Sequence, residues 1–175
     1  MAAMSRSRRA AAGIALIVAG AALLLAVLLP FANLSVPFLG TIGYAALAAG
    51  LVILALGAVN NTVAKVALFA GALGWLILAI ASVSAILPGV LVTVGGFLAA
   101  LGMLVGAIVL YTGREIVQAS GAAFVVSAIL ALVYLLPRLG VSALEAFSVA
   151  WTVALGVALV ITGVYFRRTE RKRSR

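Results

Sequence analysis

The chain has 175 residues, of which 67% are hydrophobic and 9% are charged, and its formal net charge at pH 7 is +9. Soluble domains carry about 25% charged residues, so a water-soluble core does not account for this composition, and lipid is the expected solvent. The sequence lacks His and Cys, and its three acidic residues are all Glu. This excludes most metal-ligand sets, thiol chemistry and histidine-based triads. We therefore expect no enzyme, no metal site and no cofactor.

Six apolar segments follow one another, and each is about 20 residues or longer, enough to cross roughly 30 Å of hydrocarbon as a helix. They are Ala10–Leu29, Val36–Val59, Val63–Leu87, Val90–Thr112, Ile116–Leu136 and Ala143–Phe166. The alternating polarity of membrane β-strands is absent. The sequence predicts an all-α, polytopic integral membrane protein with six transmembrane helices in one membrane domain, residues 1–175.

The first segment follows a basic stretch and so resembles a signal peptide. Its apolar run is long for a signal core, and no clear small-x-small cleavage site follows it. We expect an uncleaved first span.

The cations predict the orientation of the spans. Basic residues fill the tails 1–9 and 167–175, and Lys65 and Arg114 lie at the second and fourth turns. The positive-inside rule places these cations, and both termini, on the cytoplasmic side of a prokaryotic plasma membrane. Arg138 at the fifth turn is the exception, and Glu145 is close enough in sequence to pair with it. We expect the tails to attract anionic lipid rather than nucleic acid.

Aromatic residues near the ends of the segments fit an interfacial belt. Tyr111 and Tyr165 are expected at the inner interface. Phe31, Phe38 and Tyr134 are expected at the outer one.

Glycines and prolines indicate a threefold internal repeat. Seven pairs of glycines lie seven residues apart, whereas random placement gives about two. The glycines Gly13, Gly71 and Gly121 precede the prolines Pro30, Pro88 and Pro137 by 17, 17 and 16 residues. The chain therefore reads as three helical hairpins, roughly 8–61, 62–114 and 115–168, arranged as parallel repeats.

Close backbone approach drives helix association in lipid, so the glycines also predict which helices pack tightly. We expect the second, fourth and sixth segments to form the interior through Gly50, Gly57, Gly106, Gly113, Gly156 and Gly163. Pseudo-threefold packing of the hairpins is the simplest arrangement, and a sequential row is the alternative. The pattern does not distinguish a packed bundle from one with a central pore.

Polar and large aromatic residues inside the segments are few. Glu145, Ser148 and Thr152 share one face of the sixth segment and could line an outer vestibule. The simpler interpretation is a helix cap, with hydroxyls bonded to the preceding turn. Trp75 and Trp151 lie too deep for an interfacial belt. We expect them to be packing residues, with a ligand platform as the alternative.

Four stretches carry a resemblance to a known family: Gly13–Gly20, Gly43–Gly50, Leu87-Pro88-Gly89 and the run Gly156–Arg168. With three similar hairpins and basic tails, the chain resembles the HdeD family of bacterial membrane proteins. The aromatic-Pro-Gly turn associated with that family is present only as Leu-Pro-Gly. The resemblance implies a role in acid or general stress resistance and carries over no catalytic residue.

Three other functions stay open at this point. The chain could form a small-molecule channel, or it could be the substrate-binding subunit of a transporter. A specific small-molecule site needs several convergent polar groups. The glycine faces would also suit a structural subunit of a membrane complex, with a homo-oligomer or another membrane protein as partner.

Overall fold

The computed structural model describes residues 6–34, 36, 38–57, 61–84, 87–114, 116–139 and 147–171. Over these residues the chain forms α-helices joined by short turns: α1 (Arg6–Leu28), α2 (Leu39–Gly57), α3 (Thr62–Val83), α4 (Gly89–Thr112), α5 (Gln118–Leu135) and α6 (Ser148–Arg171), with short 3₁₀ turns η1 (Leu29–Ala32) and η2 (Leu136–Leu139). All six helices are long and apolar enough to cross a membrane. The prediction of an all-α, six-helix membrane chain is confirmed.

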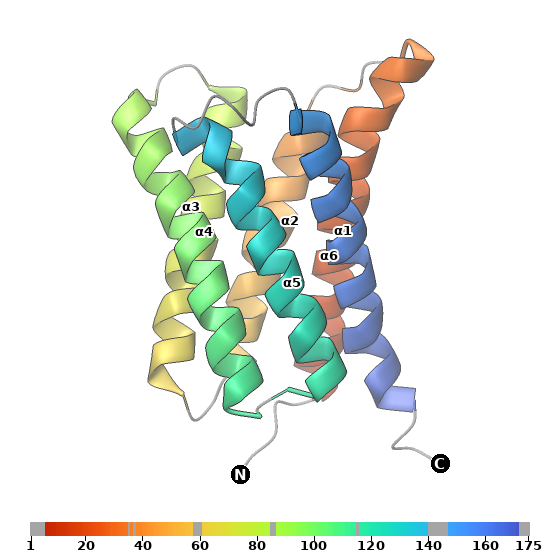
Figure 1. Cartoon of the computed structure of the whole chain (residues 1–175), viewed down its shortest axis with the longest axis vertical. Helices are drawn as coiled ribbons and strands as arrows, with labels where there is room; N and C mark the ends of the chain where they lie inside the picture. The colour runs from red at the N-terminus through yellow and green to blue at the C-terminus, as the bar shows by residue number, and fades with distance from the viewer. Residues whose placement is uncertain are drawn as a thin grey trace.

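The six helices stand side by side and close into a ring in chain order (Figure 1). Each helix packs on its neighbours in the chain, and α6 returns to pack on α1. The pairs α3–α4 and α1–α6 occupy the two sides of the ring in Figure 1, with α2 behind α5 between them. The start of α1 and the end of α6 lie at the same end. We call this the cationic end, because Arg8, Arg9 and Arg168 lie near it.

Local signals set several helix ends. Pro30 lies at the start of η1, and Asn33 follows it in the left-handed conformation with φ 58°, which turns the chain after α1. Asn61 caps α3: its side-chain oxygen accepts from the backbone N–H of Ala64 at 3.1 Å. Ser84 ends the same helix in an extended conformation. As a result α3 stops at Val83, before the predicted limit.

The seam between α1 and α6 joins two glycine pairs in antiparallel register. A Cβ atom built on Gly13 would lie 2.8 Å from the carbonyl oxygen of Gly163, and one on Gly156 would lie 3.0 Å from that of Gly20. Because the atoms met are backbone, neither helix can give way without moving as a whole. The seven-residue spacing is thus used on both sides of one contact.

The seam between α3 and α4 is built in the same way. A Cβ on Gly71 would lie 2.9 Å from the backbone nitrogen of Met103, and one on Gly102 would lie 2.5 Å from the carbonyl oxygen of Ala67. A Cβ on Gly74 would collide with the backbone of Ala99. The two seams lie on opposite sides of the ring.

The expected interior of even-numbered helices is wrong. The main contacts of α2, α4 and α6 are with odd-numbered neighbours. A glycine permits close approach because it has no side chain, but it does not determine which helix approaches. The pairing of the helices therefore depends on the packing of the whole bundle. Because α6 returns to pack on α1, the helices form a closed ring and not an open row. Pseudo-threefold packing of the three hairpins stays a prediction.

The six glycines predicted to pack meet different surroundings. Gly156 and Gly163 face α1, Gly106 faces the Leu68 side chain of α3, and Gly50 has ordinary 3.4 Å contacts with Ala15 and Leu16 of α1. Gly57 is buried at the end of α2. Gly113 is the exposed C-cap of α4, and its N–H bonds the carbonyl oxygen of Val109 at 2.9 Å.

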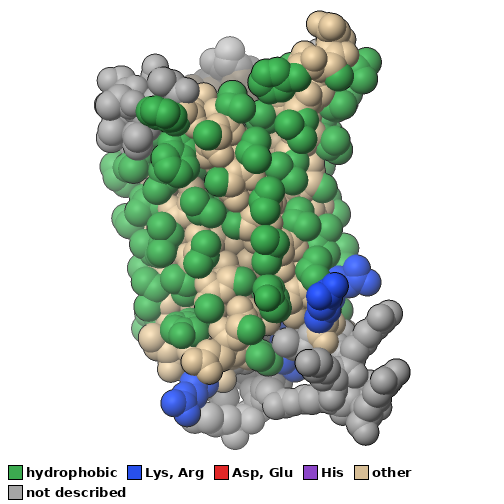
Figure 2. All heavy atoms as spheres, turned by 45° about the vertical axis from the view of Figure 1, so that its right-hand side comes forward, with side chains coloured by type: hydrophobic (Ala, Val, Ile, Leu, Met, Phe, Trp, Pro, Cys, Tyr) green, Lys and Arg blue, Asp and Glu red, His purple; other side chains and the backbone are tan. Residues whose placement is uncertain are grey.

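The flank of the bundle is apolar, as a surface in contact with lipid requires. Hydrophobic side chains cover the face shown in Figure 2, and the described cations on that face lie toward one end. Val66 and Leu73 are exposed by 62% and 52%. Helices that are apolar on both their inner and outer faces show no strong sidedness in sequence, which is typical of membrane spans.

Candidate functional site

Two residues of the stripe that was predicted to line a vestibule form a local hydrogen bond within α6. Ser148 is exposed at the first turn of α6, and Thr152 is 8% exposed. The Thr152 hydroxyl donates to the Ser148 carbonyl oxygen at 2.7 Å, as hydroxyls in helices often do with the preceding turn. Glu145 lies outside the described residues. The two described members of the stripe are brought together by the helix itself.

Large aromatic side chains from three helices meet inside the half of the bundle that is farther from the cationic end. Tyr44 of α2 and Trp75 of α3 have ring centroids 5.5 Å apart. Tyr134 of α5 lies 6.5 Å from each of them and stacks on Trp75 with an interplanar angle of 19°. We call these three residues the aromatic cluster. The cluster connects α2, α3 and α5 across the ring, and offset ring pairs of this kind add to the free energy of packing.

The aromatic cluster carries polar groups in an otherwise apolar interior. The hydroxyls of Tyr44 and Tyr134 hydrogen-bond to each other across the ring. Trp75 is fully buried, and its Nε1 atom has no hydrogen-bond partner. A buried indole N–H without a partner is costly, and it usually finds one. Trp75 therefore offers a donor that a bound acceptor would satisfy.

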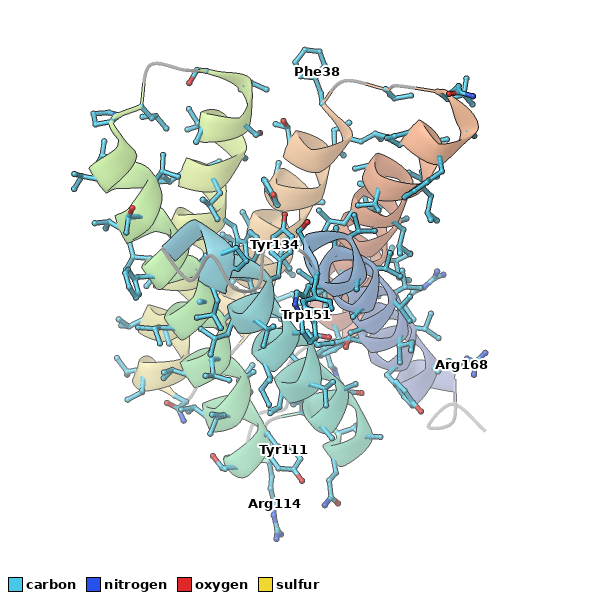
Figure 3. The ribbon with its side chains drawn as sticks, turned by 45° about the horizontal axis from the view of Figure 1, so that its top comes forward. Phe38, Tyr111, Arg114, Tyr134, Trp151 and Arg168 are labelled. Atoms are coloured by element: carbon cyan, nitrogen blue, oxygen red, sulfur yellow. The ribbon has the colours of Figure 1, made fainter. Side chains whose placement is uncertain are left out.

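Trp151 of α6 supplies a second indole N–H of the same kind. Its Nε1 atom is buried without a hydrogen-bond partner, although the side chain as a whole is half-buried. Trp151 and Tyr134 both lie inside the ring of helices in Figure 3, whereas Tyr111, Arg114 and Arg168 lie toward the cationic end. At 1.5 Å per residue, Trp75 lies about 12 Å and Trp151 about 4–5 Å from the ends of their helices. Both tryptophans therefore lie near the end of the bundle opposite the cationic end.

The expected place of Tyr134 in an interfacial belt is wrong. Its ring points into the bundle and contacts Tyr44 and Trp75. Tyr134 lies near the end of α5, which suggested a place at the interface. It lies on the inner side of the helix, however, so its ring faces the bundle and not the lipid. Tyr134 lies three residues after Ala131 and seven after Ser127, both fully buried, so it falls on the inner face. Phe31 and Phe38 are exposed by 75% and 63%, as belt residues are.

The half of the bundle nearer the cationic end is closed by close packing. Phe124 of α5 and Phe166 of α6 meet edge to face, with centroids 6.2 Å apart and an interplanar angle of 79°. Ser127 and Thr162 share a buried hydrogen bond of 2.9 Å between the same helices. Among the described residues, the buried polar side chains are Ser120, Ser127, Thr152 and Thr162, all hydroxyls. Such an interior provides no charged group to relay an ion.

At the cationic end a cation contacts a helix terminus directly. Arg8 donates from Nη1 to the carbonyl oxygen of Leu56 at 2.6 Å. Leu56 is in the last turn of α2, where unpaired carbonyls favour a positive charge. This bond ties the start of α1 to the end of α2.

The sequence pattern does not single out Tyr44, and it does not indicate that Tyr44, Trp75 and Tyr134 lie close together. A usable signal was present: all three carry a polar group on an aromatic ring and lie in the halves of their segments away from the cations. The partner of each ring depends on which helices are adjacent, and spacing alone does not give this.

Comparison of the chain with models of protein families, with curated proteins and with solved structures finds no match. What identifies the molecule is its own composition and geometry. By helix length and apolar character, the chain is a multi-pass membrane protein.

Proposed function

We propose that the chain is a non-enzymatic protein of the prokaryotic plasma membrane that acts by binding, as an HdeD-like protein in envelope stress or acid resistance. The closed apolar interior carries this proposal. Phe124 and Phe166 fill the half of the ring nearer the cationic end, and buried leucines are distributed along the core on both sides of its middle. A binding role through partner proteins needs neither a pore nor a reactive group.

Two further features support an HdeD-like arrangement. Successive helices run in opposite directions, which agrees with three hairpins in the same orientation. The cations Arg8, Arg9, Lys65, Arg114, Arg167 and Arg168 belong to helix ends or turns on the side of the termini, whereas Arg138, in η2, lies at the other end. The positive-inside rule makes this the cytoplasmic side.

Topology and stress resistance are tested separately. A reporter active only in the cytoplasm is fused behind Arg175, and in a second fusion it is inserted after Leu87, in the turn before α4. We expect activity from the first fusion alone; the reverse result would contradict the orientation. Survival at low pH is then compared between a strain lacking the protein and the complemented strain. Equal survival would remove acid resistance from the proposal.

A second candidate function is favoured by the unpartnered indole groups. Trp75 and Trp151 each present a buried N–H donor, and the aromatic cluster adds flat apolar surface beside Trp75. These groups suit an uncharged, planar molecule with hydrogen-bond acceptors. A substrate-binding subunit of a transporter would need such a site. A channel is less well supported, because the same rings and the core leucines fill the interior.

Tryptophan fluorescence tests this second function, because both tryptophans of the chain are concerned. The purified protein is titrated with a panel of planar acceptor molecules such as flavins and pterins. A saturable change that disappears in Trp75→Phe but persists in Leu76→Phe would support it. Leu76 is the neighbouring residue and is exposed by 46% on the lipid face. A change of equal size in both variants would indicate non-specific partitioning into the micelle.

A further inference from the structure

An open apolar groove runs along the outer side of the α3–α4 pair. Its volume is about 540 Å³. Its walls include Val66 and Ala70 of α3 and Leu101 and Val105 of α4, with Thr62 at one end. The groove exists because the Gly71–Gly102 seam draws the two backbones together. The large side chains of Val66, Leu101 and Val105 then project beyond the small side chain of Ala70, which leaves a groove between the two helices.

The groove lies in the leaflet at the cationic end. On α3 it spans Thr62 to Ala70, the first eight residues of rise, or about 12 Å. One leaflet has a hydrocarbon depth of roughly 15 Å. The groove therefore has the length and the apolar character of a single acyl chain, and Thr62 marks its polar limit.

A second hollow of about 490 Å³ lies at the end of α4. It is lined by polar and apolar groups together, among them Tyr111, Thr112, Arg114 and Gln118. Arg114 has a positive φ of 52° and an exposed side chain. Its sequence neighbour Glu115 lies outside the described residues. A hollow with a guanidinium, hydroxyls and an amide is suited to an anionic group.

The groove and the hollow follow one another along α4. Val105 of the groove and Thr112 of the hollow are seven residues apart, so they project from nearly the same side of the helix. The distance along the axis is about 10 Å. Along this line the surface changes from wholly apolar to polar and cationic, which is the polarity profile of an amphiphile with a negative head.

We propose that this side of α4 binds one anionic phospholipid from the leaflet at the cationic end. One acyl chain lies between α3 and α4, and the phosphate is held by Arg114 with Thr112 and Gln118. Lys65, one turn into α3, adds positive potential near the headgroup. A helix from a second copy would match the apolar groove but would leave the polar hollow unexplained.

The test counts phospholipids retained by the purified protein in native mass spectrometry. Protein released from nanodiscs that contain phosphatidylglycerol and phosphatidylcholine in equal amounts is compared with two variants. Arg114→Gln removes the cation, and Ala70→Trp fills the groove. We expect the wild type to retain one phosphatidylglycerol in preference to phosphatidylcholine. Arg114→Gln should reduce that preference by about fivefold, the effect of one cation near an anionic surface. Ala70→Trp should lower the amount of phospholipid retained, because it blocks the place of the acyl chain.

Matched controls separate this site from general attraction to the basic tails. Arg168→Gln removes an exposed cation at the same end, and Ala122→Trp adds the same bulk to the exposed side of α5. Neither should change the count, and thermal unfolding should show that all four variants are folded. Equal retention of both lipids by the wild type would overturn the proposal. So would an equal loss in Arg168→Gln, or a wild-type dimer that Ala70→Trp dissociates regardless of lipid.

Discussion

The α1–α6 seam and the middle of the ring hold their helices together in opposite ways. At the seam, Gly20 and Gly156 bring two backbones into direct contact. In the middle, α2 and α5 meet through Tyr44 and Tyr134, whose rings span the gap and whose hydroxyls bond. Lipid gives helices little hydrophobic reason to associate, so each region must rely on van der Waals contact or hydrogen bonds.

The difference bears on where function can reside. A glycine seam leaves no space and presents no side-chain chemistry, so its role is to hold the ring closed. The middle contains the indole and phenol groups of Trp75, Tyr44 and Tyr134, including a donor without a partner. Substitutions in the two regions should therefore differ in size and in kind.

The largest effect is expected at the seam. Gly20→Leu places a Cβ 2.9 Å from the backbone nitrogen of Val160, and a backbone atom cannot rotate away. We expect unfolding in mixed detergent to become easier by about 3 kcal/mol, the upper part of the range for overpacking. Gly40→Leu is the control, because nothing lies within 4 Å of a Cβ there. Equal losses in the two variants would remove the seam from the account.

A smaller loss is expected in the aromatic cluster. Trp75→Leu removes part of a fully buried ring, and we expect about 2 kcal/mol, roughly half the cost of truncating a buried aromatic residue to Ala. The control Leu76→Ala lies on the lipid face and should cost much less by the same detergent unfolding assay. A stabilised Trp75→Leu protein would instead mark the cluster as a strained site kept for binding.

A still smaller effect is expected from the bond between α5 and α6. Ser127→Ala and Thr162→Val each remove one partner of the buried 2.9 Å hydrogen bond. A double-mutant cycle should give a coupling of about 0.6 kcal/mol, the mean for such bonds in membranes. A coupling near zero would show that packing alone holds these two helices together.

The smallest effect is expected at the cationic end. Arg8→Gln removes the charge that contacts the Leu56 carbonyl, and the expected loss is about 0.3 kcal/mol at low salt. Unfolding measured at two ionic strengths checks this, because screening should abolish the difference. A loss that is independent of salt would assign the effect to the arginine stem rather than to its charge.

Much of the fold could be read from particular residues. The apolar runs predicted all six helices, and the described helices begin within a few residues of the expected limits: α3 at Thr62 against Val63, and α4 at Gly89 against Val90. Thr152 bonds the preceding turn, as the simpler interpretation of its stripe expected. Tyr134 could not be placed, because both faces of an apolar helix look alike in sequence.

The sequence by itself determined that lipid surrounds this chain, how many helices are long enough to cross it and which residues permit close approach. The length and composition of the segments and the positions of the glycines set these properties. Only the tertiary structure decided that Gly13 and Gly20 meet Gly163 and Gly156, and that two tyrosines meet across the ring. The physical reason is that a glycine or an aromatic ring defines a surface without defining its partner. The partner follows from the order in which all six helices close.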